Sequence, residues 1–94
     1  TAEMQAAFNQ TVLPGISAFK PELLIISAGF DAHKNDPLAG LCFETDDFVW
    51  MTRQLMALAD TQCQGRLVSL LEGGYDLPSL ADSVLQHVRT LMTG

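Results

Sequence analysis

The hydrophobic positions of this chain form two continuous apolar runs, separated by stretches of helical spacing. The runs, ELLIISA at 22–28 and RLVSLLE at 66–72, lack the polar alternation of a half-exposed strand. Such runs are typical of strands that are buried on both faces, as in parallel sheets. We therefore predict two strands of this kind.

Three stretches have apolar residues at helical spacing. The first covers 2–13 and should stop near the Pro14–Gly15 pair. The second should begin at Thr45, a residue type favoured as an N-cap, and end near 64–65. The third has Pro78 in its first turn, where the missing N–H is not needed. The apolar positions are Met4, Ala7, Phe8 and Val12 in the first helix; Phe48, Met51, Leu55 and Leu58 in the second; and Leu80, Ala81, Val84, Leu85, Val88, Leu91 and Met92 in the third.

The expected order of elements is helix, strand, long loop, helix, strand, helix. Two strands joined by a crossover helix in this way are parallel. Both then end at the same edge of the sheet, so Asp31 and Tyr75 emerge from loops on one side, where open α/β sheets bind ligands. Two parallel strands do not make an independent sheet. We therefore expect an α/β fold of which this chain is a fragment.

Composition and charge exclude several classes of function. The 94 residues suffice for one domain at most, and the start at Thr1 rather than Met suggests a segment of a longer protein. The formal charge is −6 and the few basic residues are scattered, so direct binding to nucleic acid is not expected. No segment resembles a signal peptide or could cross a bilayer, which favours a cytoplasmic location without membrane contact. Cys42 and Cys63 form no CxxC unit and should be free thiols.

Two short motifs carry possible chemistry. IISAGFDAH, at 25–33, ends a predicted strand with two possible zinc ligands, Asp31 and His33. An aspartate at this position also commonly caps a turn with its own backbone amides. The glycines of EGGY, at 72–75, could merely allow a tight turn, or they could let a ligand or neighbouring backbone approach while Tyr75 presents its hydroxyl. From the residues alone, both interpretations stay open.

The remaining aromatic and titratable residues have simpler interpretations. Trp50 and the methionines lie within helical periodicity and are expected in the core. His87, on the last helix, is expected at its surface or rim.

Together, SAGFDAHKNDPLAGL at 27–41 and LEGGYDL at 71–77 resemble the histone deacetylase and acetylpolyamine amidohydrolase superfamily. The resemblance covers nearly the whole chain. It implies an arginase-like, three-layer α/β/α fold with a central parallel sheet. This α-β-α-β-α chain, residues 1–94, would then be the C-terminal part of a single catalytic domain. The implied activity is Zn²⁺-dependent removal of acetyl or other acyl groups from lysine side chains of proteins or from polyamines.

The resemblance also implies roles for individual residues. Asp31 would be a zinc ligand, and the hydroxyl of Tyr75 would polarise the substrate carbonyl and stabilise the oxyanion. Leu38 would line the tunnel that receives the acyl-amine chain. Gly73 and Gly74 would shape the wall beside the tyrosine.

The other catalytic groups of that family have no counterpart in this chain. Its remaining zinc ligands, an Asp-x-His pair, and its tandem histidines lie upstream of these motifs, whereas His33 and His87 are the only histidines here. The family pattern does not make the residue at His33 a ligand. A catalytic zinc needs three protein ligands, so residues 1–94 alone should be inactive, and an open sheet edge should promote self-association. Two alternatives stay open: a non-catalytic fragment or pseudoenzyme that serves packing or protein binding, and another metallohydrolase on the same scaffold.

Overall fold

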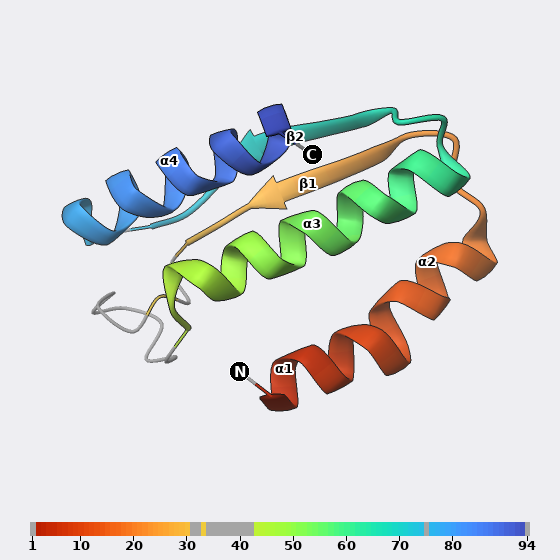
Figure 1. Cartoon of the computed structure of the whole chain (residues 1–94), viewed down its shortest axis with the longest axis horizontal. Helices are drawn as coiled ribbons and strands as arrows, with labels where there is room; N and C mark the ends of the chain where they lie inside the picture. Colours follow the sequence, from red (N-terminus) through yellow and green to blue (C-terminus); the bar gives the residue numbers. More distant parts are fainter. Residues whose placement is uncertain (1, 31–32, 34–42, 75, 94) are drawn as a thin grey trace.

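The computed structural model describes residues 2–30, 33, 43–74 and 76–93. In this part of the chain, helices precede, connect and follow two strands, as Figure 1 shows. The helical elements are α1 (Ala2–Ala7), η1 (Phe8–Val12), α2 (Leu13–Phe19), α3 (Thr45–Gln62) and α4 (Leu77–Thr93), and the strands are β1 (Leu24–Ala28) and β2 (Leu67–Leu71).

The two strands pair in parallel, which confirms the expected strand–helix–strand unit. The register runs from Leu24 opposite Leu67 to Ala28 opposite Leu71. A further backbone bond continues the pairing past the last residues, since the N–H of Glu72 donates to the carbonyl of Ala28 at 2.8 Å. Both carboxyl ends therefore lie at the same edge of the sheet.

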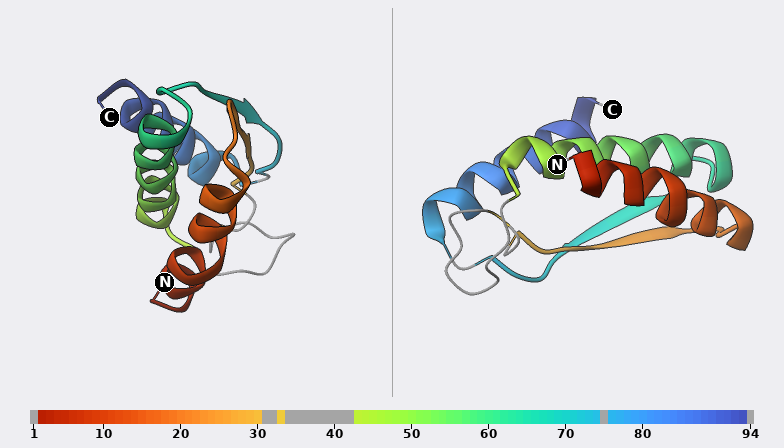
Figure 2. Two further views of the ribbon diagram at one scale, coloured as in Figure 1. Left: turned by 90° about the vertical axis from the view of Figure 1, so that its right-hand side faces the viewer. Right: turned by 90° about the horizontal axis from the view of Figure 1, so that it is seen from below.

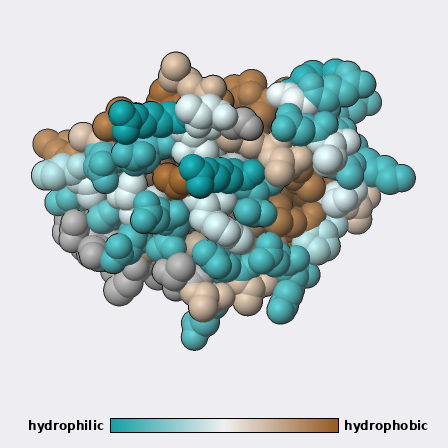
Figure 3. Space-filling view, viewed as in Figure 1, coloured by the Kyte–Doolittle hydropathy of each residue, from teal (hydrophilic) through white to brown (hydrophobic). Residues whose placement is uncertain are grey.

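The helices cover only one face of this sheet, as Figure 2 shows in its right-hand view. On the opposite face Ile25, Val68 and Leu70 are 58%, 45% and 56% exposed. The prediction of strands buried on both faces is therefore wrong for this chain by itself, because none of its described elements covers the second face. The helical side, in contrast, has mainly hydrophilic side chains with separate hydrophobic patches (Figure 3).

The first helix continues past the Pro14–Gly15 pair at which it was expected to stop. Residues 8–12 form a π-helical turn, in which the N–H of Leu13 donates to the carbonyl of Phe8, five residues back. A proline inside an α-helix clashes with the carbonyl four residues before it, and a widened turn relieves that clash. Pro14 then lies in the first turn of α2, and the helix ends only at Phe19.

Helix α3 begins with a different cap from the one predicted. Glu44, not Thr45, is the N-cap residue, and it forms a capping box with Asp47. The Glu44 side chain accepts the backbone N–H of Asp47, while the Glu44 N–H donates to Asp47 Oδ2 at 2.8 Å. The helix ends at Gln62, slightly before the predicted 64–65 stop. Because the reciprocal box occupies the cap, the hydroxyl of Thr45 is available for other contacts.

The core lies between β1, α3 and the beginning of α4. Ala28, Phe30 and Phe48 form its buried cluster, and the rings of Phe30 and Phe48 meet edge to face at 5.1 Å. Trp50 is half-buried against Phe8, also edge to face, at 5.6 Å. The partly buried residues that pack against the cluster are Ile26, Phe43, Met51, Leu80 and Val84.

Helix α4 turns polar residues inward, contrary to the predicted apolar face. Its buried residues are Ser79, Ser83, His87 and Thr90. Of the residues assigned to the apolar face, Leu80 and Val84 do pack against the core, whereas Leu85, Val88 and Met92 are 51%, 45% and 80% exposed. Small polar side chains allow α3 and α4 to lie side by side, and this packing determines the rotation of α4 about its axis.

The prediction that His87 lies at the surface or rim of the last helix is wrong. His87 is buried, because hydroxyl groups from two other elements satisfy its ring. Thr52 Oγ1 lies 3.0 Å from Nδ1, and Ser69 Oγ lies 2.7 Å from Nε2. The Thr52 hydroxyl donates its proton to the carbonyl of Phe48, so it accepts from Nδ1–H. Nε2 is then the acceptor for the Ser69 hydroxyl. His87 thus connects α4 to both α3 and β2.

Burial lowers the pKa of His87 below the usual 6.5. The folded state therefore binds fewer protons than the unfolded state just below that pH. The stability that His87 contributes is fully present above about pH 6.5, the unfolded value, and is lost as the pH falls toward the lowered folded value.

We expect His87→Leu to destabilise the full-length protein at pH 7.5 by about 1–3 kcal/mol, because it leaves Ser69 without its buried partner. The difference between wild type and variant should shrink as the pH falls through the window below 6.5. Urea unfolding at a series of pH values measures both quantities. A difference that stays constant down to acidic pH would contradict the assignment of a neutral, buried His87.

Candidate active site at the carboxyl edge of the sheet

The loops that follow the two strands are joined directly at the sheet edge. The backbone N–H of Phe30 donates to the carbonyl of Gly73 at 2.8 Å. Phe30 stands immediately before Asp31, and Gly73 stands two positions before Tyr75. Each of the two loops therefore contributes one residue of its motif to this hydrogen bond.

The side chain of Phe30 anchors the same junction to the core. It is 4% exposed, and its ring meets the ring of Phe48 and, at 5.6 Å, the ring of His87. Three elements thus determine where the first loop leaves the sheet. Phe30 lies just after the end of β1, and its ring contacts Phe48 of α3 and His87 of α4.

Position 74 requires a glycine, because a neighbouring side chain approaches the backbone closely. Its φ is +140°, a backbone conformation that is essentially restricted to glycine. A Cβ at this position would stand 2.7 Å from Leu80 Cδ1 and 3.5 Å from Phe30 Cβ. The glycine therefore lets the second loop pack between Phe30 and the first turns of α4.

Asp76 fixes the chain directly after the tyrosine. Its carboxylate accepts the backbone N–H of Ser79 at 3.1 Å, and its carbonyl accepts the N–H of Leu80 at 2.8 Å. These are the contacts of a helix N-cap, so α4 starts at a defined position. The second loop is thereby bounded on both sides by hydrogen-bonded residues, Gly73 and Asp76.

His33 is buried and faces the helices. It is 6% exposed, its N–H donates to the carbonyl of Phe30 at 3.2 Å, and its ring stacks on Phe48. It also pairs with Phe43 as an isolated parallel bridge. Its Nε2 lies 3.3 Å from Thr45 Oγ1. These contacts with α3 were not predicted, and no local pattern in the sequence indicates them.

Three of the predicted site residues, Asp31, Leu38 and Tyr75, lie outside the described residues, whereas Gly73 and Gly74 are described and follow the carboxyl end of β2. Within the described ranges, no three His, Cys, Asp or Glu side chains are grouped so that they could hold a metal ion. Cys63 is a buried free thiol that contacts the carbonyl of Pro21 at 3.3 Å. Cys42, the other cysteine predicted to be a free thiol, lies outside the described residues.

Nearly the whole chain matches a sequence model of known proteins, described as "Histone deacetylase domain", over residues 1–91. The chain belongs to the histone deacetylase family. The predicted family and its α/β fold are therefore confirmed.

Individual histone deacetylases support the same assignment. The protein named "Histone deacetylase 10, chloroplastic" of Oryza sativa subsp. japonica is 43% identical over 89 residues, which are 95% of this chain and 20% of that protein. For "Histone deacetylase 14, chloroplastic" of Arabidopsis thaliana the identity is 42%, over 95% of this chain and 21% of the relative. The solved structure of the HDA15 HD domain superposes with a TM-score of 0.85 at 39% identity, over 96% of this chain and 24% of that one. The chain thus spans about a fifth of the length of these curated relatives.

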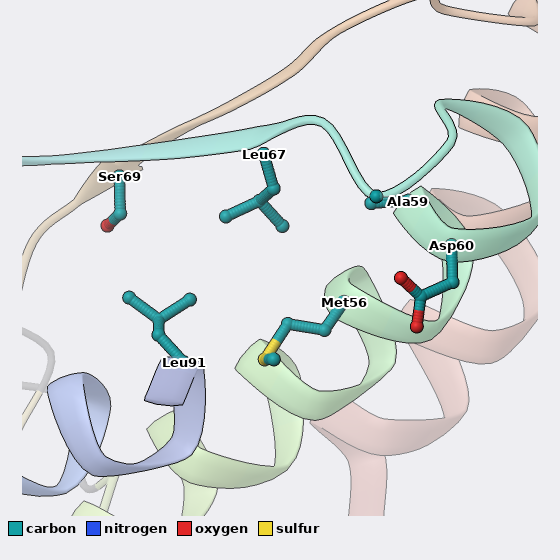
Figure 4. A pocket seen from close by; sticks show the side chains of 7 residues that line it. Met56, Ala59, Asp60, Leu67, Ser69 and Leu91 are labelled. Atoms are coloured by element: carbon teal, nitrogen blue, oxygen red, sulfur yellow. The ribbon is translucent and has the colours of Figure 1, made fainter. Parts of the chain in front are cut away.

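The hollows of this histone deacetylase segment are not all at the motif edge. One, of about 220 Å³, lies at the opposite end of the sheet, where β2 begins. Figure 4 shows Leu67, Met56 and Leu91 around it, with Ser69 and Asp60 as its polar neighbours. A second, of about 270 Å³ and mostly apolar, is lined by residues of η1, β1, α3 and α4, among them His87. No helix of the described part is long and apolar enough to span a membrane.

We expect Gly74→Ala to destabilise the full-length protein by about 1–3 kcal/mol, because the added methyl group meets Leu80 and the backbone conformation is strained. Gly15→Ala is the matched control. Gly15 lies in α2 with no atom near its added Cβ, so this change should be neutral or stabilising by up to about 1 kcal/mol. Chemical denaturation of both variants tests the pair. Equal free energies of unfolding would show that the second loop tolerates a side chain at position 74.

Proposed function

We propose that this chain is the C-terminal part of a single deacetylase-like catalytic domain, in a zinc-dependent amidohydrolase. Its substrates would be acetylated amines, either acetyl-lysine side chains of proteins or acetylpolyamines. Family membership supports this proposal, and the hydrogen bond between Phe30 and Gly73 carries it, because it joins the two loops whose motifs resemble those of the family. A cytoplasmic location stays a prediction.

Asp31 is the residue we assign to the metal. A carboxylate is a suitable zinc ligand, and Asp31 lies between two residues, Phe30 and His33, whose side chains are both buried. The histidines of the chain are engaged elsewhere: His33 contacts Thr45, and both ring nitrogens of His87 have hydroxyl partners. The other ligands would come from outside these 94 residues, and for that reason we propose that residues 1–94 alone are inactive.

Tyr75 is the residue we assign to the substrate carbonyl. When bound, zinc would polarise that carbonyl and lower the pKa of a water molecule. A phenol hydroxyl that donates to the same carbonyl oxygen stabilises it most when negative charge develops there. The hydrogen bond at Gly73, the positive φ of Gly74 and the cap at Asp76 would hold the loop that carries the tyrosine, and Leu38 would line the substrate tunnel.

We expect Asp31→Ala in the full-length protein to lose both zinc and deacetylase activity, since one of three protein ligands is removed. His33→Ala should keep most of its zinc, because His33 is not a ligand in this proposal. Metal analysis of the two purified variants, beside wild type, measures the difference. The reverse order of zinc loss would contradict the assignment of Asp31 as the ligand.

We expect Tyr75→Phe to keep its zinc and its fold, because the ring and the two preceding glycines remain. Only one hydrogen-bond donor is lost, and its contribution grows as charge builds on the carbonyl oxygen. The effect should therefore fall on kcat more than on KM, with kcat lower by roughly 10²–10³-fold. Steady-state kinetics on an acetylated amine, with zinc measured in the same sample, tests this. A kcat near that of wild type at full zinc occupancy would contradict the catalytic role of Tyr75 and leave the EGGY loop a purely structural element.

A further inference from the structure

The hollow where β2 begins is formed by side chains from three elements, as Figure 4 shows. Leu67 and Ser69 extend from β2 toward the helices, Met56 and Asp60 come from α3, and Leu91 comes from the last turn of α4. We call this space, of about 220 Å³, the β2 hollow. It lies at the opposite end of the sheet from the two motifs and is therefore separate from the candidate active site.

The walls of the β2 hollow are suited to a hydrocarbon group. Leu67, Met56 and Leu91 are half-buried and present aliphatic or thioether surface to the space. An apolar cavity of roughly 150 Å³ holds a benzene molecule. The β2 hollow thus has room for a six-carbon ring with one substituent.

Ser69 offers this space an acceptor and no donor. The hydroxyl of Thr52 donates to the carbonyl of Phe48, so the proton of His87 is on Nδ1 and its Nε2 is an acceptor. The hydroxyl proton of Ser69 is therefore used in the 2.7 Å bond to Nε2 of His87. Only the lone pairs of Ser69 Oγ remain for other contacts.

Asp60 adds a negative charge that has no counterion among the described residues. Its carboxylate points into the β2 hollow (Figure 4), and no described residue forms a hydrogen bond or ion pair with it. The basic residue nearest to it along the chain, Arg66, donates instead to the carbonyl of Glu22 and to Gln64 Oε1. Arg53 lines a neighbouring hollow together with Asp60 but forms no ion pair with it.

The position of Asp60 in its helix makes this charge unfavourable for the helix itself. Asp60 lies in the last turn of α3, which contains no basic residue. The C-terminal end of a helix carries a partial negative charge, so it favours cations and disfavours a carboxylate. A cation bound beside Asp60 would compensate both the carboxylate and the helix end.

We propose that the β2 hollow binds a small ammonium compound with a hydrocarbon body. Both polar side chains that line it can only accept hydrogen bonds, so the polar group of the ligand has to donate, and the charge of Asp60 selects a cation. The ammonium group pairs with Asp60, and the hydrocarbon part lies against Leu67, Met56 and Leu91. Because Asp60 is exposed to water, the affinity is low, with a dissociation constant on the order of 1 mM. This inference is independent of the proposed deacetylase activity.

The test uses the full-length protein with isotope-labelled methionine methyl groups, observed by NMR. Met56 lies in the β2 hollow, whereas Met51 packs against the core and serves as an internal reference. The Met56 resonance is assigned with Met56→Leu. The probes are cyclohexylammonium and cyclohexanol, which have similar shapes and differ in charge.

Two variants isolate the contribution of the carboxylate. Asp60→Asn removes its charge and keeps its shape. Asp46→Asn is the matched control, because Asp46 is exposed at the opposite end of the same helix and its substitution changes the net charge equally.

We expect cyclohexylammonium to shift the Met56 resonance in a saturable way and to bind wild type roughly threefold to tenfold more tightly than cyclohexanol. Asp60→Asn should lose this preference for the cation, and Asp46→Asn should keep it. The proposal is overturned if the Met56 resonance does not respond, or if wild type binds both probes equally. It is also overturned if Asp46→Asn loses the preference to the same extent, or if only Met51 responds, which would place the probe in the apolar hollow beside β1.

Discussion

The hydrogen bond from the Phe30 N–H to the Gly73 carbonyl is the contact on which the candidate site depends. It closes the last step of the parallel pairing and joins the two motif-bearing loops at the same time. The ring of Phe30 anchors this junction, because it contacts the rings of Phe48 of α3 and His87 of α4. Gly74 belongs to the same arrangement, since a side chain there would collide with Leu80. Phe30 thus connects the hydrophobic core, the sheet and the candidate site.

The polar interior of α4 is the second feature with wide consequences. A helix that buries serine, threonine and histidine gains little from apolar burial, so hydrogen bonds must satisfy the buried groups. His87 meets this condition on both nitrogens, whereas Ser83 Oγ finds no partner among the described residues. Apolar residues are exposed on α4 and on the uncovered face of the sheet. This exposure is consistent with the chain spanning only about a fifth of the length of its curated relatives.

At the beginning of α3, the capping box leaves the side chain of Thr45 available for contacts with other elements. Two acidic residues, Glu44 and Asp47, satisfy each other's backbone groups in the capping box. That leaves Thr45 to connect His33 to α4, and the base of the long loop is thereby joined to both helices. Without the capping box, the threonine would compete for the same first-turn amides. The loop anchor and the helix start are therefore parts of one arrangement.

The sequence by itself determined the two strands, their parallel pairing, the connecting helix and the edge at which both motifs emerge. Each of these follows from local apolar patterns and from the chirality of strand–helix–strand units, which need no distant partner. The motifs also identified the family, because they consist of contiguous residues. Tertiary structure decided the rest: the π turn that carries the helix past Pro14, the rotation of α4 that buries His87, and the helix-facing ring of His33. These depend on partners far away in the sequence, such as Ser69 and Thr52 for His87, and hydropathy along one helix carries no information about a hydroxyl that another element supplies.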